Sequence, residues 1–346
     1  MTDLIAILKR WTPPQDKYWY AYKMNEEYAR QAVAASLQSS HGLPYQPEDV
    51  FLTNGSIAAL AVLFGAIVNP GDEVIFITPP WLLYEAMILD AGGLPVRVGM
   101  DKETFDLDVA GICSAITAKT RAVIINSPHN PTGKIYPENT LRELAKMLEE
   151  ASILNGRTIY IISDEAYRRI IFDGRKYVSP SLFYRNTFLI YTYGKVLLAP
   201  GQRIGYAALH PDMASSDILR EVIQTIQMVN GWCFPNALMQ RALADLEGIS
   251  VDIGHLQEKR NRLVESLRQQ GYQACLPEGT FYVMVRSPWG NDEAFVDLLN
   301  SYNIFCIPGS LMDFPGFFRL SITASDEMLD RAIPKFAAAL KQARSR

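Results

Sequence analysis

The sequence has few of the residues that build metal or disulfide sites. Its 346 residues include four cysteines and four histidines. No two cysteines form a C-x-x-C pair, and the histidines show no spacing typical of zinc ligands, so the sequence predicts no metal site. We therefore interpret the cysteines as reduced thiols and expect a cytoplasmic protein.

Long hydrophobic runs and an excess of one charge are also missing. No stretch reaches the roughly 18 uninterrupted apolar residues that a membrane-spanning helix needs, and the N-terminus lacks the apolar region of a signal peptide. The net charge is −4, from 33 basic and 37 acidic residues, with no basic cluster that would bind nucleic acid. We expect neither a membrane nor a nucleic acid as partner.

What the sequence does contain is the pattern of a large α/β protein. Hydrophobic residues make up 49% and charged residues 20%, a balance typical of globular chains, and the length suggests about two domains. Short β-branched runs alternate with longer helical patterns, which indicates a parallel sheet flanked by helices. The predicted strands are 49–53, 73–78, 121–126, 158–163, 187–192 and 203–209, and the helices between them include 56–68, 81–92 and 137–152.

A second, smaller α/β region follows in the C-terminal third. A long charged helical stretch covers about 236–270, and two further strands are predicted at 281–286 and 317–323. A helix at 325–343 closes the chain.

Polar and aromatic residues follow five of the predicted strands, where each strand ends. Ligands of open parallel sheets bind beyond the carboxyl ends of the strands, so these residues are expected to meet at one edge. In chain order they are Asn54, Gly55 and Ser56, then Trp81, then Asn130, then Asp164 and Tyr167, and finally Thr192 and Lys195.

Each of these groups could bind a ligand or could have an ordinary structural role. Gly55 and Ser56 open an apolar helix whose N-terminus would bind an anion, or they form an ordinary turn. Trp81 could stack on a planar ring or pack in the core. Asp164 follows four apolar residues, where a carboxylate needs a cation, either a ligand's protonated ring nitrogen or a structural ion pair.

Lys195 and Arg203 complete the set. A partly desolvated lysine is a nucleophile toward aldehydes, although a lone lysine is more often a surface residue. Arg203 would bind a phosphate or form a surface ion pair. A ligand with an aldehyde, a flat ring, a ring nitrogen and a phosphate is pyridoxal 5′-phosphate, and no single one of these residues indicates it alone.

With these motifs the chain resembles the aminotransferase class I and II family, the fold-type I pyridoxal-phosphate enzymes. The resemblance covers about residues 18–340 and rests on N-P-T-G at 130–133, D-E-x-Y at 164–167, and Lys195 followed by G-x-R-x-G-Y at 201–206. It implies a large domain with a mostly parallel, helix-flanked sheet of seven strands. The domains that we predict are an N-terminal segment (1–40) packed on the small domain and on a dimer partner, the large cofactor-binding domain (41–245) and the small domain (246–346).

The resemblance also implies a role for each residue. Lys195 matches the lysine that bonds to the cofactor's aldehyde and moves the α-proton, and Asp164 matches the acid that keeps the ring nitrogen protonated. Tyr167 and Asn130 match the partners of the 3′-oxygen, and Trp81 matches the stacking aromatic. The phosphate is expected to contact Gly55, Ser56, Ile57, Thr192, Arg203 and, from a partner subunit, Tyr20.

Arg319 matches the arginine that binds the substrate's α-carboxylate, with an ordinary strand arginine as the alternative. Asn130 and Tyr84 are further candidates for substrate contact. The expected reaction is transfer of the amino group of an L-α-amino acid to a 2-oxo acid by a homodimer.

Two departures from the family pattern leave an alternative open. Gly194 precedes the lysine where the family usually has serine or alanine, and few residues precede Tyr20, so the N-terminal part of the substrate pocket is expected to be shortened. The alternative is a pyridoxal-phosphate lyase or cyclase of a natural-product pathway. A ligand-binding regulator is disfavoured, since the chain shows no DNA-binding extension.

Overall fold

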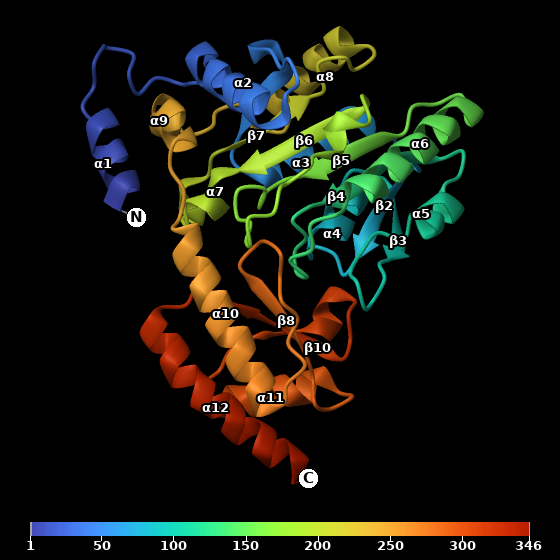
Figure 1. Ribbon diagram of the computed structural model, residues 1–346. Helices are drawn as coiled ribbons and strands as arrows, with labels where there is room; N and C mark the ends of the chain where they lie inside the picture. The colour runs from blue at the N-terminus through green and yellow to red at the C-terminus, as the bar shows by residue number, and fades with distance from the viewer. Residues whose placement is uncertain (1, 346) are drawn as a thin grey trace.

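A seven-stranded sheet dominates the computed structural model, which describes residues 2–345 (Figure 1). The strand order is β1-β7-β6-β5-β4-β2-β3, and β7 alone runs antiparallel to its neighbours. The predicted mostly parallel sheet is therefore confirmed. Its strands are β1 (Val50–Thr53), β2 (Glu73–Thr78), β3 (Leu94–Gly99), β4 (Thr120–Asn126), β5 (Tyr160–Asp164), β6 (Thr187–Thr192) and β7 (Gly205–Leu209).

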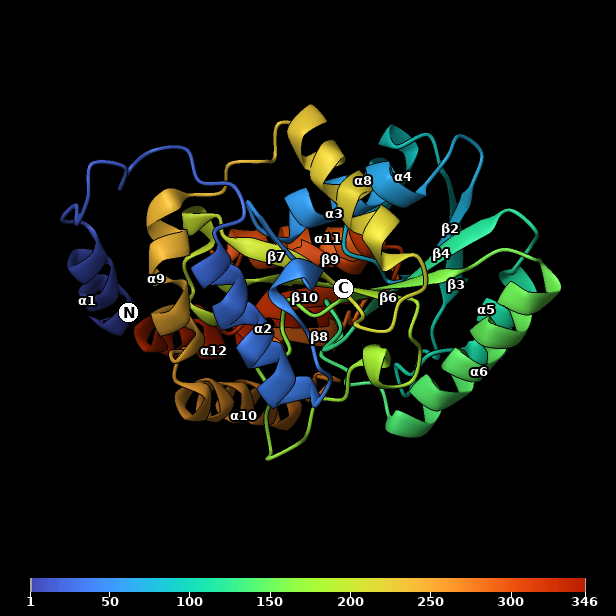
Figure 2. The same cartoon turned by 90° about the horizontal axis from the view of Figure 1, so that it is seen from above.

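Helices cover both faces of this sheet, which explains why its central strands read as continuous apolar runs. Successive side chains of a strand point to opposite faces, so Val74 and Phe76 pack under one helical layer and Ile75 and Ile77 under the other. Figure 2 shows the first layer, α3, α4 and α8, on one side of the sheet, and α2 and α6 on the other. The bounds are α2 (Glu27–His41), α3 (Ser56–Ile67), α4 (Tyr84–Asp90), α5 (Val109–Ala115), α6 (Glu138–Leu154) and α8 (Ser216–Val229).

In the large sheet, the edge strand β3 is the strand that the sequence analysis missed; in the small sheet it also missed the two-residue strand β9 (Ile307–Pro308). Strand β3 contains Pro95 and Arg97, and most of its residues are at least partly exposed. A strand at the edge of a sheet needs less apolar surface than a central one, so its sequence lacks the signal that identified the other six.

The C-terminal third forms a second unit around a three-stranded antiparallel sheet of order β8-β10-β9. The predicted helical stretch 236–270 divides into two helices, and the predicted strands and closing helix agree with the structure to within about two residues. The elements are α9 (Ala237–Glu247), α10 (Ile253–Gln270), β8 (Tyr282–Arg286), α11 (Asp292–Ser301), β9 (Ile307–Pro308), β10 (Phe317–Ser321) and α12 (Asp326–Arg344).

The N-terminal helices lie elsewhere than we expected. α1 (Thr2–Trp11) and α2 pack on α9, and Val33 and Leu37 of α2 join the core formed by β1, β6 and β7. Trp11 Nε1 donates to Asp245 at 2.6 Å. The N-terminal helices therefore belong to the core beside β1, β6 and β7, and the described residues of the small-domain core include none of theirs. The domain boundaries themselves stay a prediction.

Gly133 is one of the residues through which loops of the two sheets contact each other. The carbonyl oxygen of Gly133 accepts hydrogen bonds from the backbone N–H groups of Glu278 and Gly279 at 3.0 and 2.9 Å. Gly133 has φ of 74°, and a Cβ atom there would lie 2.2 Å from Cβ of Pro277. Only glycine permits this close approach without displacing backbone.

Within residues 2–345 no helix is long and apolar enough to cross a bilayer.

Gly133→Ala tests this junction. We expect the free energy of unfolding to fall by about 3 kcal/mol, from the left-handed backbone and from steric overlap together. Gly156→Ala is the matched control, because Gly156 has φ of 59° but a Cβ atom added there would meet no other atom within 4 Å; it should lose only about 1 kcal/mol. Equal losses in urea unfolding would contradict a tight junction at Gly133.

Candidate active site

The polar strand ends do meet, in a pocket at the carboxyl ends of β4, β5 and β6. Most predicted cofactor-binding residues line it, and Gly55 adjoins them as the N-cap of α3. Tyr20, Tyr84 and Arg319 are not in the lining. The lining consists of Ser56, Ile57, Trp81, Asn126, Asn130, Asp164, Ala166, Tyr167, Thr192, Gly194, Lys195, Pro200 and Arg203. No group of three or more potential metal ligands occurs in the described part of the chain.

Asp164, the last residue of β5, is the charged group at the bottom of the pocket. It is 6% exposed, and its Oδ2 accepts a hydrogen bond from the hydroxyl of Tyr84 at 2.6 Å. Burial raises the pKa of the Asp164 carboxyl, whereas the Tyr84 hydrogen bond and the charge of Lys195 lower it. No ion pair to Asp164 is found among residues 2–345. A cationic ligand group would therefore be favoured beside it.

An asparagine that the sequence analysis missed, Asn126, fixes the loop beside Asp164. Its Oδ1 accepts from the backbone N–H of Asn130 at 2.8 Å, and its Nδ2 donates to the backbone oxygen of Asp164 at 2.9 Å. Asn126 thus ties β4, β5 and the N-P-T-G loop together. Its position at the end of a predicted strand was a usable signal, because amides at strand ends were already candidates.

Lys195 lies on the short helix α7 (Tyr193–Val196), directly after β6. Its Nζ is 5.8 Å from the centre of the Tyr167 ring, on the pocket side, and the residue is half-buried. Gly194 has a packing reason: a Cβ atom there would lie 3.0 Å from Cα of Pro200. A serine or alanine at position 194 would therefore crowd the backbone of Pro200, which explains why this chain has glycine there.

The N-terminus of α3 and Arg203 form an anion-binding corner. Gly55 has φ of 91°, and a Cβ atom there would lie 2.4 Å from a terminal nitrogen of Arg203. Because Gly55 has no side chain, the guanidinium lies against the helix start and donates to the backbone oxygens of Asn54 and Pro200, at 2.8 and 2.9 Å. A guanidinium beside helix N–H groups is suited to a phosphate.

Thr192, the last residue of β6, completes this side of the pocket. It is buried, and its hydroxyl donates to the backbone oxygen of Ile204 at 3.4 Å. Ser56 and Ile57 are the first residues of α3, so their backbone N–H groups belong to the unbonded first turn of the helix.

Arg319, on β10 of the small sheet, adjoins the pocket through its contact with the lining residue Asn130. Its guanidinium donates to Oδ1 of Asn130 at 2.9 Å and lies 4.1 Å from the centre of the Tyr282 ring. The hydroxyls of Tyr282 and Tyr167 are 3.3 Å apart. Tyr282 is a second residue that sequence reasoning missed; it begins β8, and nothing in its sequence context distinguishes it from a packing aromatic.

The three remaining aromatic candidates, Trp81, Tyr84 and Tyr20, lie in different positions relative to the pocket. Trp81 packs edge-on against Tyr84, with ring centres 5.3 Å apart. Tyr84 is 2% exposed and contacts Asp164, so the predicted substrate contact has no support from its position and the residue instead holds the carboxylate. Tyr20 is 57% exposed, and its hydroxyl donates to the backbone of Thr12 in the N-terminal segment.

Known proteins show the same architecture. The family model described as "Aminotransferase class I and II" matches residues 23–336. A probable aspartate/prephenate aminotransferase of Thermus aquaticus is 33% identical over 94% of this chain and 85% of its own length. The aspartate aminotransferase of Thermotoga maritima is 31% identical over 88% of this chain and 79% of its own. The chain therefore belongs to the class I and II aminotransferase family.

Solved structures agree. An aminotransferase from Eubacterium rectale has a TM-score of 0.94 at 30% identity, covering 99% of this chain and 87% of its own. A Thermus thermophilus aspartate aminotransferase variant has a TM-score of 0.86 at 28% identity, covering 97% and 92%. Fold, site and relatives together identify the chain as an aminotransferase, a transferase of the kind that the sequence motifs predicted.

Tyr84→Phe tests how Asp164 is held. The variant loses the donor to a buried carboxylate, so at pH 7 and without added cofactor the free energy of unfolding should fall by about 2 kcal/mol. The pKa of Asp164 rises further in the variant. The loss should therefore shrink as pH falls through the folded-state pKa of this carboxyl, because below it the carboxyl is protonated in the folded state of wild type and variant alike.

Tyr136→Phe is the matched control for this measurement. The hydroxyl of Tyr136 is buried without a hydrogen-bond partner in the described structure, so its removal should cost nothing measurable. Equal effects of the two substitutions in chemical unfolding would contradict the role of Tyr84.

Proposed function

We propose that this aminotransferase binds pyridoxal 5′-phosphate and transfers the amino group of an L-α-amino acid to a 2-oxo acid. The observation that carries the proposal is the pairing, in one pocket, of a buried carboxylate without an ion-pair partner, Asp164, with the half-buried amine of Lys195. Members of this family generally depend on that cofactor.

The residues present fit the cofactor. The absence of a Cβ atom at Gly55 leaves the α3 N-terminus and Arg203 side by side, which suits the phosphate. The carboxylate of Asp164 suits a protonated ring nitrogen, because burial has raised the pKa of the acid and a cation would offset that cost. Trp81 lines the pocket and offers a ring face. We assign the 3′-oxygen to Asn130 and Tyr167.

When bound, the cofactor supplies an aldehyde that takes up the amino group and a protonated ring that withdraws electrons from the substrate's Cα. Lys195 would hold the cofactor through its aldehyde, and its Nζ would serve as the base that accepts and returns the proton of the substrate's Cα. The carboxylate of Asp164 would favour the protonated form of the cofactor's ring nitrogen. Tyr84 and Ala166, which donate to its two oxygens, hold that carboxylate in place.

Arg319 is the group that we assign to the substrate's α-carboxylate. Its contact with Tyr282 and its hydrogen bond to Asn130 fix the guanidinium at the edge of the pocket. The guanidinium fork fits a carboxylate. The names of the relatives make aspartate as donor and prephenate as acceptor the first pair to assay.

We also propose that the working form is a homodimer and that Tyr20 reaches the partner's phosphate corner. Four large aromatic side chains are exposed near the N-terminal segment, Tyr18, Tyr20, Tyr22 and Phe234, which suits a surface covered by a second copy. Sedimentation should give twice the monomer mass, and a monomeric, active protein would contradict this.

The unpaired cysteines support a cytoplasmic location.

Lys195→Ala tests the assignment of the amine. We expect purified wild-type protein with pyridoxal phosphate to show an absorption band that borohydride removes irreversibly, and the variant to lack it and to lose activity by at least about a thousandfold. Lys176→Ala, which removes an exposed lysine outside the pocket, should behave as wild type. A wild-type protein without the band would refute the cofactor assignment.

A panel of amino acids separates transamination from elimination. Product formation should require a 2-oxo acid acceptor and should yield one new amino acid per keto acid released. Release of ammonia without an acceptor would instead favour the lyase alternative.

Arg319→Lys tests carboxylate binding. Because an ammonium cannot replace the fork of a guanidinium, KM for the amino donor should rise about tenfold or more, with a smaller change in kcat. Arg331→Lys, on the exposed side of α12, is the control and should leave both constants unchanged. An unchanged KM in Arg319→Lys would remove Arg319 from the substrate site.

A further inference from the structure

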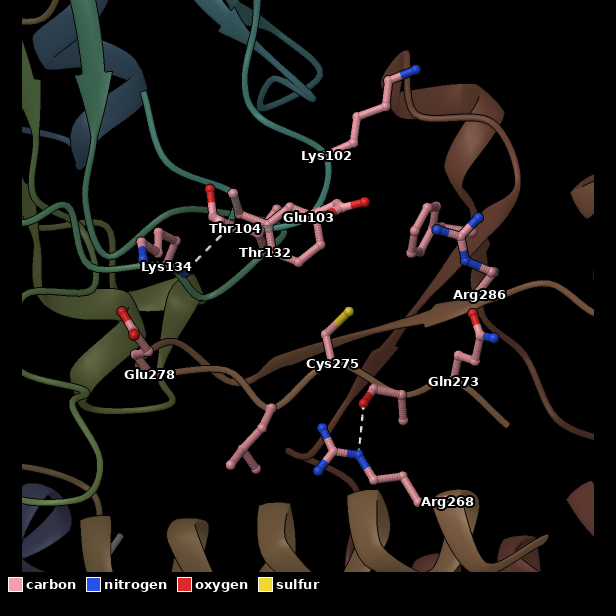
Figure 3. Close-up of a pocket in the computed structure, with 14 residues that line it drawn as sticks. Lys102, Glu103, Thr104, Thr132, Lys134, Arg268, Gln273, Cys275, Glu278 and Arg286 are labelled. Carbon is pink, nitrogen blue, oxygen red and sulfur yellow. Dashed lines mark hydrogen bonds between the residues drawn. The ribbon is translucent and has the colours of Figure 1, made fainter. Parts of the chain in front are cut away.

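A second cavity lies between the two sheets, separate from the site described above. Its volume is about 430 Å³. One wall comes from the large sheet, at 102–105 and 132–134, and the other from the small-domain segment 268–286 and Phe317. Figure 3 shows Lys134 and Glu278 on one side of the opening, Arg286 on the other, and the sulfur of Cys275 pointing into the space between them.

The cavity carries an excess of positive charge. Four basic side chains line it, Lys102, Lys134, Arg268 and Arg286, and none of them forms an ion pair within residues 2–345. Two acidic residues line it as well. Both oxygens of one of them, Glu278, are already engaged, by Arg175 at 3.2 Å and by the N–H of Ile135 at 2.9 Å.

The two arginines are held in place while keeping donors for a ligand. Arg268 uses Nε to donate to the backbone oxygen of Ala274 at 2.9 Å, and the guanidinium of Arg286 lies 4.8 Å from the centre of the Phe317 ring. Both positive charges act on the thiol of Cys275, whose pKa burial raises. Both guanidinium groups line the cavity together with Cys275, so an anion in the cavity would be attracted by two positive charges of this wall.

We propose that this cavity is a second binding site, for a small organic polyanion that carries phosphate or several carboxylate groups. Such a ligand satisfies unpaired cations from both walls at once. The proposal does not depend on the cofactor assignment, because binding is measured directly.

The position of the cavity connects it to the substrate site. Thr132 and Lys134, which line it, flank Gly133, one of the residues through which loops of the two sheets contact each other. Phe317, in the opposite wall, lies two residues before Arg319 on β10, and Arg319 in turn bonds to Asn130 of the first loop. An occupant therefore contacts both backbone segments that carry the substrate-binding pair, and its binding changes KM for the amino donor.

Calorimetric titration tests the site. The probes are pyrophosphate and citrate, added at constant ionic strength to protein saturated with pyridoxal phosphate, and they distinguish a phosphate ligand from a carboxylate ligand. We expect one of them to bind wild type, and to bind Lys134→Ala/Arg286→Ala at least about tenfold more weakly, since two charge-assisted contacts are lost. Lys146→Ala/Arg331→Ala removes the same charge outside the cavity and should bind as wild type.

Two further variants complete the binding test. Lys134→Ala alone, whose side chain has no hydrogen bond or ion pair in the described structure, guards against misfolding of the double variant and should also bind more weakly. Arg319→Lys should still bind the probe; loss of binding there would place the anion in the substrate site and overturn the proposal. Equal weakening in both double variants, or no binding to wild type, would overturn it as well.

The connection to the substrate site is measured by kinetics. Saturation with the bound probe should change KM for the amino donor at least about twofold in wild type and leave it unchanged in Lys134→Ala/Arg286→Ala. Binding without any change in KM would overturn the regulatory part of the proposal.

Discussion

The buried carboxylate of Asp164 is the constraint on which the rest of the site depends. Removing an anion from water is costly, so the surrounding structure must supply donors and positive charge. Tyr84 and Ala166 supply the donors, and Lys195 supplies the nearby charge. Asn126 fixes the backbone of Asp164 and, with the same side chain, the loop that begins at Asn130. The geometry of the pocket thus follows from stabilising one charge.

The two sheets contribute different things to this pocket. The large sheet provides the carboxylate, the amine and the anion-binding corner, all at strand ends or helix starts. The small sheet provides Arg319, together with the Tyr282 ring on which it rests. Within one chain, the groups assigned to the cofactor therefore come from the large sheet and its connections, and the arginine assigned to the substrate comes from the small sheet. The contact of Gly133 with the 277–279 loop is one of several that hold the two parts together, beside the backbone bond from Thr280 to Ile170.

Much of the fold and most of the pocket could be predicted from sequence, and the reasons for the failures are physical. Buried strands of a parallel sheet are nearly all apolar, so six of seven were visible, whereas the exposed edge strand β3 was not. Strand ends meet at one edge, so Asp164 and Lys195 could be placed together. The contacts of Tyr84 with Asp164 and of Tyr282 with Arg319 depend on tertiary packing, as does the placement of the N-terminal helices on α9.

The reversed direction of β7 determines how Lys195 and Arg203 are spaced. Because β7 starts at the edge where β6 ends, one short connection carries both Lys195 and Arg203. The spacing of these two groups is therefore set locally, by the turn of α7 around Pro200 and by the Gly205 backbone packed against Gly55. If the small sheet shifts during turnover, Arg319 moves with it while the amine and the guanidinium keep their separation. The distance between the amine and the phosphate-binding corner is thus independent of where the small sheet lies.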